Sequence, residues 1–191
     1  MTSYRLDQDE QGRPVLWTAR LRLRLPAMKD LSPGFRFWSS ERSHMMGGPW
    51  SRDQTRDAFH DLLDQWHRHG FSLFSVTLHG SDTAIGGIGP FFPFKHREPE
   101  LGWSLWRLAD EGKGLAYEAA AAARDWFFAH SGHKTAVSYT DPANARSHRL
   151  CERLGGVVDP RAWCPDAEPT LTYRHYAPGH APADLSRGAL A

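Results

Sequence analysis

The chain has 191 residues, with 23 Lys and Arg against 22 Asp and Glu, so its formal net charge is +1. Charges of both signs alternate along the chain without forming blocks, which argues against nucleic acid or an anionic membrane surface as a partner. No window approaches the roughly 18 consecutive apolar residues of a membrane span, and residues 1–13 lack the apolar core of a signal peptide. We therefore expect one soluble, cytoplasmic domain over residues 1–191, with loosely ordered tails at 1–14 and 177–191.

Cysteine and histidine usage predicts no metal cofactor. Cys151 and Cys164 are too few for a disulfide framework and have no partner at metal-ligand spacing. The eleven histidines are scattered, with no His-x-x-x-His pair and no accompanying set of carboxylates.

The first half of the chain shows a strand pattern followed by a helix pattern. Residues 15–26, VLWTARLRLRLP, alternate leucine and arginine in their second half, which predicts a half-buried strand that ends at Pro26. Residues 51–70 open with a capping serine, carry apolar residues at helical spacing and stop at Gly70. This segment is predicted to be an amphipathic helix.

The second half mixes strands and helices. Residues 71–80 and 83–94 flank a short turn and predict a hairpin. Further strands are predicted at 99–108, 134–140 and 169–176, and helices at 113–130 and 144–156. Because this order combines antiparallel hairpins with crossovers, we expect an α/β sandwich around a mixed sheet.

A glycine-rich turn, EGKGLA at 111–116, joins a predicted strand to a predicted helix. Unpaired backbone N–H groups at the start of a helix bind anions. A Walker loop does not fit, since Gly114 follows Lys113 where Ser or Thr is required, and a Rossmann fingerprint does not fit, since Tyr117 replaces its third glycine. The alternative is that the glycines only make a tight connection.

Two co-linear motifs resemble the GNAT acetyltransferases. GKGLAYEA at 112–119 resembles the acetyl-CoA pyrophosphate loop of that superfamily, and DPANARSHRLCERLGG at 141–156 resembles its downstream asparagine-containing helix. Residues 18–26, TARLRLRLP, look like the opening strand of the branch that includes the ribosomal-protein N-terminal alanine acetyltransferases. The resemblance implies a mixed, mostly antiparallel twisted sheet flanked by helices, with a splayed strand pair as the cofactor cleft. It also implies acetyl transfer from acetyl-CoA to a primary amine by direct attack in a ternary complex.

The resemblance also implies a set of cofactor-binding residues. The pyrophosphate is expected on the backbone amides of Glu111, Gly112, Lys113, Gly114, Leu115 and Ala116, and the pantetheine arm along Ser104, Leu105 and Trp106. The family often has Gln or Arg at the place of Glu111, so we expect this carboxylate to turn toward solvent. Asn144 matches a position that contacts pantetheine, although a helix cap alone would also explain it.

For catalysis, the resemblance points to Ser147 and Glu100. Many family members protonate the departing thiolate with a tyrosine, but Cys151 stands at that position. Ser147 matches the alternative donor of the ribosomal-protein branch, and we expect Cys151 to pack in the core. Glu100 is the candidate base, with a structural salt bridge as its alternative reading.

The acceptor is expected over residues 39–50, 89–99 and 161–169, which are rich in aromatic residues and methionine. Phe91, Phe92, Phe94, Trp163, Met45 and Met46 could form an apolar pocket or merely cover the sheet, and Glu41 and Glu98 could attract a cation. We favour a small amine or amino-acid derivative as acceptor over a protein or peptide N-terminus. A non-catalytic acyl-CoA-binding sensor is a further alternative, and a homodimer through the C-terminal strand stays open.

Overall fold

The structure is a computed structural model that describes residues 4–165 and 170–182. In this part of the chain, nine strands form one sheet in the order β1-β2-β3-β4-β5-β6-β7-β9-β8. The strands are β1 (Arg5–Gln8), β2 (Pro14–Trp17), β3 (Leu21–Arg24), β4 (Phe74–Leu78), β5 (Ala84–Phe91), β6 (Glu100–Leu105), β7 (Thr135–Thr140), β8 (Val157–Val158) and β9 (Leu171–Tyr176). Every neighbouring pair is antiparallel except β6 and β7. The predicted mixed, mostly antiparallel α/β fold is therefore confirmed.

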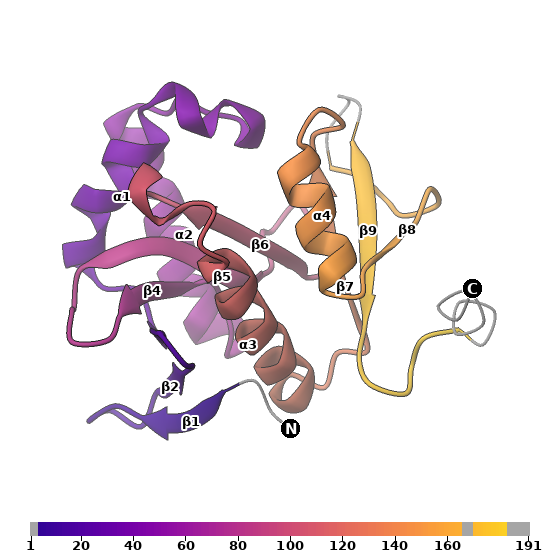
Figure 1. Cartoon of the computed structure of the whole chain (residues 1–191), viewed down its shortest axis with the longest axis horizontal. Helices are drawn as coiled ribbons and strands as arrows, with labels where there is room; N and C mark the ends of the chain where they lie inside the picture. Colours follow the sequence, from indigo (N-terminus) through magenta and orange to yellow (C-terminus); the bar gives the residue numbers. More distant parts are fainter. Residues whose placement is uncertain (1–3, 166–169, 183–191) are drawn as a thin grey trace.

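Four α-helices flank the sheet in the described residues. They are α1 (Leu31–Trp38), α2 (Arg52–His69), α3 (Leu115–His130) and α4 (Ala145–Arg153), with the short 3-10 helices η1 (Met28–Asp30), η2 (Glu41–Met46) and η3 (Leu108–Asp110). In Figure 1, α3 lies in front of the sheet and α2 behind it. The predicted helix at 51–70 is confirmed as α2, which is capped by a Ser51–Gln54 capping box and ends at Gly70 with φ of 74°.

The N-terminal region differs from the prediction in two ways. The single strand expected over 15–26 is a hairpin, because the chain turns between β2 and β3, where the backbone N–H of Thr18 donates to the carbonyl of Leu21 at 2.9 Å. Part of the segment expected to be a loose tail also forms β1, which pairs with β2 along its whole length. Leucine and arginine alternate only after this turn, and the turn itself carries no glycine or proline, so the sequence pattern did not reveal it.

The core lies between the sheet and α3. Leu16, Leu21, Phe74, Ile85 and Phe127 are each fully buried. Alanines at 119–123 allow α3 to approach β5 closely, and a Cβ added at Gly89 would lie 3.5 Å from the Cβ of Ala123. Small side chains on both elements thus set the short distance between helix and sheet.

The sheet splits between β6 and β7. Their parallel register consists of one pair, Glu100 with Val137, supported by the Val137 N–H, which donates to the carbonyl of Pro99 at 3.0 Å. Beyond this point the Ser138 hydroxyl, instead of a backbone amide, donates to the Leu101 carbonyl at 2.7 Å. The expected splayed pair is present, and it opens toward Leu105 on one side and Thr140 on the other.

A small polar cluster lies in the core beneath the split. His175, Ser138 and Cys151 are 1%, 2% and 0% exposed. Because the Ser138 hydroxyl donates to Leu101, the His175 Nε2–H must be the donor in its 3.0 Å contact with Ser138 Oγ. Burial, with a smaller contribution from the positive charge of Arg124, lowers the pKa of His175 to about 3, so the imidazole is neutral at pH 7.

The neutral, buried His175 predicts an acid-dependent loss of stability. In the unfolded chain this imidazole binds a proton near pH 6.5, whereas in the folded chain it does so only near pH 3, so stability falls as the pH is lowered through this window. Between pH 7 and pH 5 the wild type should lose about 2 kcal/mol more unfolding free energy than His175→Asn, measured by urea denaturation. His180→Asn, which removes an exposed imidazole, should behave as the wild type. Equal losses in all three proteins would show that His175 is not held neutral.

Candidate active site

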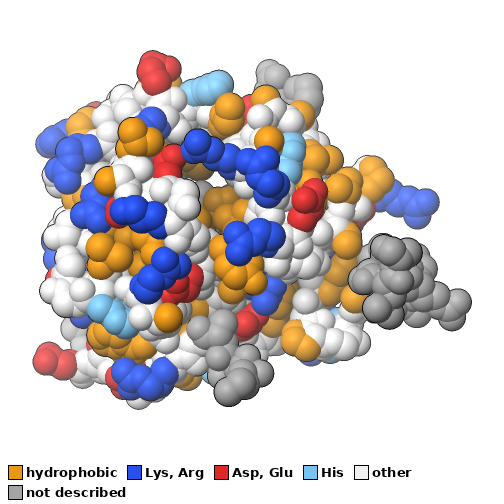
Figure 2. Space-filling view, viewed as in Figure 1, with side chains coloured by type: hydrophobic (Ala, Val, Ile, Leu, Met, Phe, Trp, Pro, Cys, Tyr) orange, Lys and Arg blue, Asp and Glu red, His pale blue; other side chains and the backbone are white. Residues whose placement is uncertain are grey.

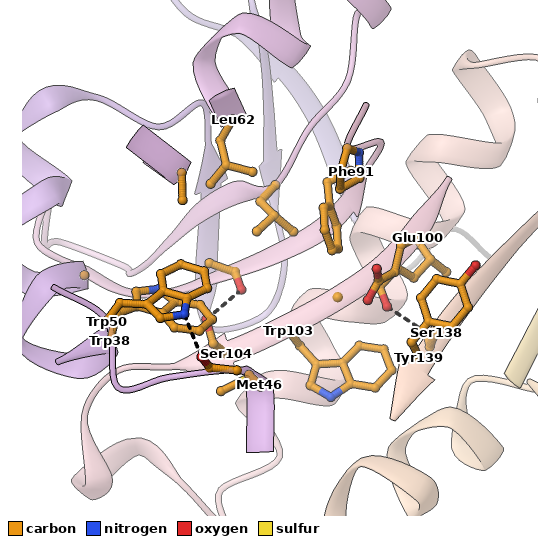
Figure 3. A pocket seen from close by; sticks show the side chains of 18 of the residues that line it. Trp38, Met46, Trp50, Leu62, Phe91, Glu100, Trp103, Ser104, Ser138 and Tyr139 are labelled. Carbon is orange, nitrogen blue, oxygen red and sulfur yellow. Dashed lines mark hydrogen bonds between the residues drawn. The ribbon is translucent and has the colours of Figure 1, made fainter. Parts of the chain in front are cut away.

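A cavity of about 770 Å³ lies against β6 and extends from the α1–η2–α2 region to β7 and α4. Figure 3 shows the stacked rings of Trp38 and Trp50 at one end of this cavity and Glu100 with Tyr139 at the other. Trp103 and Ser104, both on β6, lie between the two ends. The split in the sheet therefore opens onto a single continuous space.

The glycine turn after β6 presents unpaired backbone donors. Gly112 and Gly114 have φ of 73° and 75°, left-handed values that disfavour other residues. Among the described residues, no hydrogen bond is made by the amides of residues 112–117. The Glu111 amide, which we expected to be available as well, donates to the Leu108 carbonyl at 3.1 Å. The turn therefore presents the free backbone N–H groups of residues 112–117 at the start of α3, and the Glu111 amide is not among them.

Glu118 fixes this turn against the β2–β3 hairpin. Its carboxylate accepts from the Thr18 hydroxyl at 2.6 Å and from Arg20 Nε at 2.6 Å, while Arg20 Nη1 also donates to the Lys113 carbonyl at 2.9 Å. Burial alone would raise the pKa of Glu118, but the hydrogen bonds from Thr18 and Arg20 outweigh it and lower that pKa. The turn is thus held from outside, which leaves its N–H groups free.

The Glu111 side chain does not turn toward solvent as expected. Its carboxylate forms an ion pair with Arg42 of η2 and a second one, at 2.7 Å, with Arg146 of α4. The side chain is 25% exposed. Arg42 donates to one carboxylate oxygen and Arg146 to the other, so both oxygens of Glu111 are paired, with cations from opposite sides of the split.

The expected pantetheine strand is partly occupied by a protein side chain. Arg42 donates to the carbonyls of Leu105 at 3.0 Å and Trp106 at 2.7 Å. The Ser104 side chain points instead toward β5, where its Oγ donates to the Gly87 carbonyl at 3.3 Å and accepts from the Trp106 indole at 3.1 Å. The edge of β6 thus offers backbone groups at its end, and Ser104 contributes to the floor of the cavity.

Helix α4 brings a hydroxyl to the cavity. Asn144 caps the helix, its Oδ1 accepting from the Ser147 N–H at 3.1 Å, and its side-chain nitrogen makes no hydrogen bond among the described residues. The Ser147 hydroxyl accepts from the indole N–H of Trp103 at 3.2 Å. Because the indole is only a donor, the Ser147 proton remains available to an acceptor in the cavity.

Glu100 lies where β6 and β7 separate. Its carboxylate, 13% exposed, points into the cavity in Figure 3, and His96 Nδ1 lies 3.4 Å from its Oε2. The neighbouring Tyr139 has a raised pKa, caused first by burial and then by the charges of Glu98 and Glu100, so its phenol stays neutral.

The opposite end of the cavity is apolar. Trp38 and Trp50 stack with ring centroids 4.1 Å apart. The cavity wall also includes Met45, Met46, Phe59, Leu62 and Phe91, of which Met46 lies beside the tryptophan pair and Phe91 lies toward Glu100 in Figure 3. Among the other predicted acceptor residues, Phe94 is 91% exposed and Glu98 forms an ion pair with Arg174, so neither lines this cavity. Phe92 and Trp163 are not part of its wall either.

Three other observations bear on the sequence-based expectations. Cys151 is fully buried, and burial raises the pKa of its thiol to about 12, in agreement with a packing role. No group of three or more His, Cys, Asp or Glu in residues 4–165 and 170–182 could hold a metal ion. None of the described helices combines the length and apolarity required to cross a bilayer.

Sequence reasoning missed Arg42 and Trp103. Arg42 lies in a connecting segment with no motif, some 60 residues before the turn it reaches. Trp103 was read as one apolar residue of a strand, and its contact with Ser147 spans 44 residues of sequence. Tertiary contacts alone bring these side chains to the site.

Comparison with known proteins agrees with this geometry. Residues 20–157 match the family model of the acetyltransferase (GNAT) domain. An acetyltransferase from Agrobacterium tumefaciens is 38% identical, with 89% of this chain and 98% of that chain aligned at a TM-score of 0.82.

Two more distant structures share the fold. The ribosomal-protein-S5-alanine acetyltransferase from Vibrio fischeri is 19% identical over 88% of this chain and 99% of that chain, with a TM-score of 0.64. The ribosomal L7/L12 alpha-N-protein acetyltransferase RimL, in complex with coenzyme A, is 12% identical over 83% of this chain and 95% of that chain, with a TM-score of 0.65. With the family model matched over most of its length and the split sheet and glycine turn in place, the chain belongs to the GNAT acetyltransferase family.

Proposed function

We propose that this acetyltransferase moves the acetyl group of acetyl-CoA to the primary amine of a small molecule or amino-acid derivative, by direct attack in a ternary complex. One observation carries the proposal: the Ser147 hydroxyl and the Glu100 carboxylate line the same cavity at the split between β6 and β7. A proton donor and a proton acceptor thus face one space, as acyl transfer to an amine requires.

The residues present fit the acetyl-CoA co-substrate. The amides of residues 112–116, free of other partners among the described residues, suit a pyrophosphate at the start of α3. Backbone groups of Leu105 and Trp106 and the free side-chain nitrogen of Asn144 suit the amides of a pantetheine arm. Lys113 adds a positive charge beside the turn.

The reaction then needs two proton movements. The amine nitrogen attacks the thioester carbonyl carbon, a C–N bond forms and the C–S bond breaks. Glu100, directly or through a water molecule, accepts the proton lost by the amine. Ser147 passes its proton to the departing thiolate while a water molecule of the cavity returns a proton to the Ser147 oxygen, and the proton on Glu100 is released to solvent. The Trp103 indole orients the Ser147 hydroxyl for this step by donating to its oxygen.

The form of the cavity favours a small acceptor with an apolar body. An ammonium group near Glu100 would be attracted by the carboxylate, and the Trp38–Trp50 pair with Met46 and Leu62 would cover an apolar group at the other end. A second ammonium group carried to the apolar end beside Trp38 and Trp50 would be desolvated, so the cavity suits an arylalkyl or aliphatic amine better than a polyamine.

A protein or peptide N-terminus is the second candidate. Met45, 41% exposed, lies both in the cavity wall and at the surface, so a longer acceptor could extend outward past η2. An α-amino group, with a pKa near 8, would also need a weaker base than a lysine would.

Replacement of Gly112 should weaken cofactor binding without unfolding the protein. A side chain at Gly112 meets no atom within 4 Å, so Gly112→Ala adds only the strain of its left-handed backbone, about 1 kcal/mol. Gly12→Ala is a matched control, because Gly12 has φ of 74° and equally open surroundings in the β1–β2 turn. Both variants should lose similar stability, whereas calorimetry should show weaker acetyl-CoA binding for Gly112→Ala alone. Equal affinities would remove the glycine turn from the cofactor site.

Removal of the proton donor should lower turnover and leave cofactor binding unchanged. Ser147→Ala should reduce kcat for thiol release by about 100-fold with an unchanged Kd for acetyl-CoA. Trp103→Phe keeps an aromatic ring but removes the indole donor, so we expect a smaller loss of about 5-fold. A Ser147→Ala enzyme with normal kcat would exclude Ser147 as the donor, and a wild type that binds acetyl-CoA without releasing thiol on any amine would support a sensor.

The acceptor class can be tested with amines of different character. Thiol release should be faster with arylalkylamines and apolar amino-acid amides than with spermidine, and Trp50→Ala should raise KM for the apolar amines by about 10-fold. Glu100→Gln should lower kcat with every amine. Preference for peptides with a free N-terminus over all small amines would select the second candidate.

A further inference from the structure

Three charged side chains meet beside the end of the β6 strand. Glu111, at the start of the glycine turn, forms ion pairs with Arg42 of η2 and Arg146 of α4, and we name this set the arginine bridge. The two arginines come from opposite sides of the split, and their side chains are 31% and 79% exposed. Figure 2 shows Lys and Arg side chains gathered around a hollow between the two halves of the molecule.

Arg42 uses backbone groups that the proposed pantetheine site also needs. Its guanidinium donates to the carbonyls of both Leu105 and Trp106, in addition to its pair with Glu111. A pantetheine arm along the end of β6 would compete for these carbonyls. Bound acetyl-CoA and the Arg42 position seen here are therefore at least partly exclusive.

The charges beside the turn favour an anion with more oxygens than one carboxylate. Two guanidinium groups against one carboxylate leave a net positive charge, and the free amides of residues 112–117 add to it. A guanidinium pairs with phosphate in the same fork geometry as with carboxylate. The pyrophosphate of the cofactor is the dianionic group that the proposed function brings to this turn.

We propose that the arginine bridge is a cofactor-exchange device: Arg42 and Arg146 leave Glu111 and bind the acetyl-CoA pyrophosphate, while Glu111 holds them at the turn when no cofactor is bound. This inference rests on the proposed acetyl-CoA site. Glu111 is then a competitor of the pyrophosphate, and its charge weakens cofactor binding. A Glu111 that only supported the turn would act in the opposite direction.

The test is a calorimetric titration of CoA and of dephospho-CoA into the wild type, Arg42→Gln, Arg146→Gln and Glu111→Gln. Arg56→Gln is the matched control, because Arg56 also pairs with carboxylates, but these are Asp53 and Asp57 of α2, which lie outside the site. We expect Kd to rise about 10-fold for Arg42→Gln and about 3-fold for the more exposed Arg146→Gln. Glu111→Gln should lower Kd by about 3-fold, and the control should match the wild type.

The outcomes can be separated because two ligands are compared and because the arginine variants and Glu111→Gln are expected to change Kd in opposite directions. Equal changes with CoA and dephospho-CoA support the pyrophosphate as the exchanged anion, because dephospho-CoA lacks only the 3′-phosphate; changes confined to CoA overturn that assignment. Weaker binding by Glu111→Gln, or arginine variants that bind as the control does, overturns the exchange while leaving the proposed function intact. A wild type that binds neither ligand overturns both. If Arg42→Gln does not fold, Arg146→Gln and Glu111→Gln still decide the sign.

Discussion

The site depends on the single point of pairing between β6 and β7. Each strand is fully paired on its outer side, with β5 and β9, but the two share only the Glu100–Val137 register. Unpaired backbone groups inside a protein are costly unless another partner satisfies them. Ser138 replaces one missing ladder bond with its hydroxyl and Arg42 caps two carbonyls with its guanidinium. The hydrogen bonds of Ser138 and Arg42 thus stabilise the open gap. A ligand rich in amides could take the place of the Arg42 guanidinium at the two carbonyls.

The positions of the candidate catalytic residues follow from this gap. Glu100 lies at the point where the strands separate, and α4, which follows β7, presents Ser147 to the indole of Trp103 on β6. The proposed base therefore comes from β6 and the proposed acid from α4, on the two sides of the split. The neutral cluster of His175, Ser138 and Cys151 beneath them provides a rigid, uncharged floor. Rigid support of this kind is what positions catalytic groups precisely enough for acyl transfer.

The glycine turn differs from a simple set of free backbone amides because it carries an acidic side chain. Its amides are free, but the acidic side chain at its first position draws two arginines across the split. A carboxylate beside the proposed phosphate site would be unfavourable by itself, and the paired arginines offset that repulsion. The structure thus accommodates the departure at Glu111 through residues from two other elements, so the departure does not argue for a loss of catalysis.

The sequence by itself determined most of the elements and the identity of the turn. The α2 helix, the β4–β5 hairpin, the glycine turn and the cap of α4 were all predicted, because each depends on local periodicity or capping chemistry. The division of 15–26 into two strands was not predicted, since a turn without glycine or proline leaves no local signal. Only the tertiary structure decided that Glu111 pairs with Arg42 and Arg146. The same holds for the hydrogen bond from Trp103 to Ser147 and for the ion pair between Glu98 and Arg174. These contacts join segments that are distant in sequence. They form because the split sheet places the strand ends next to one another, and a local sequence pattern carries no information about that placement.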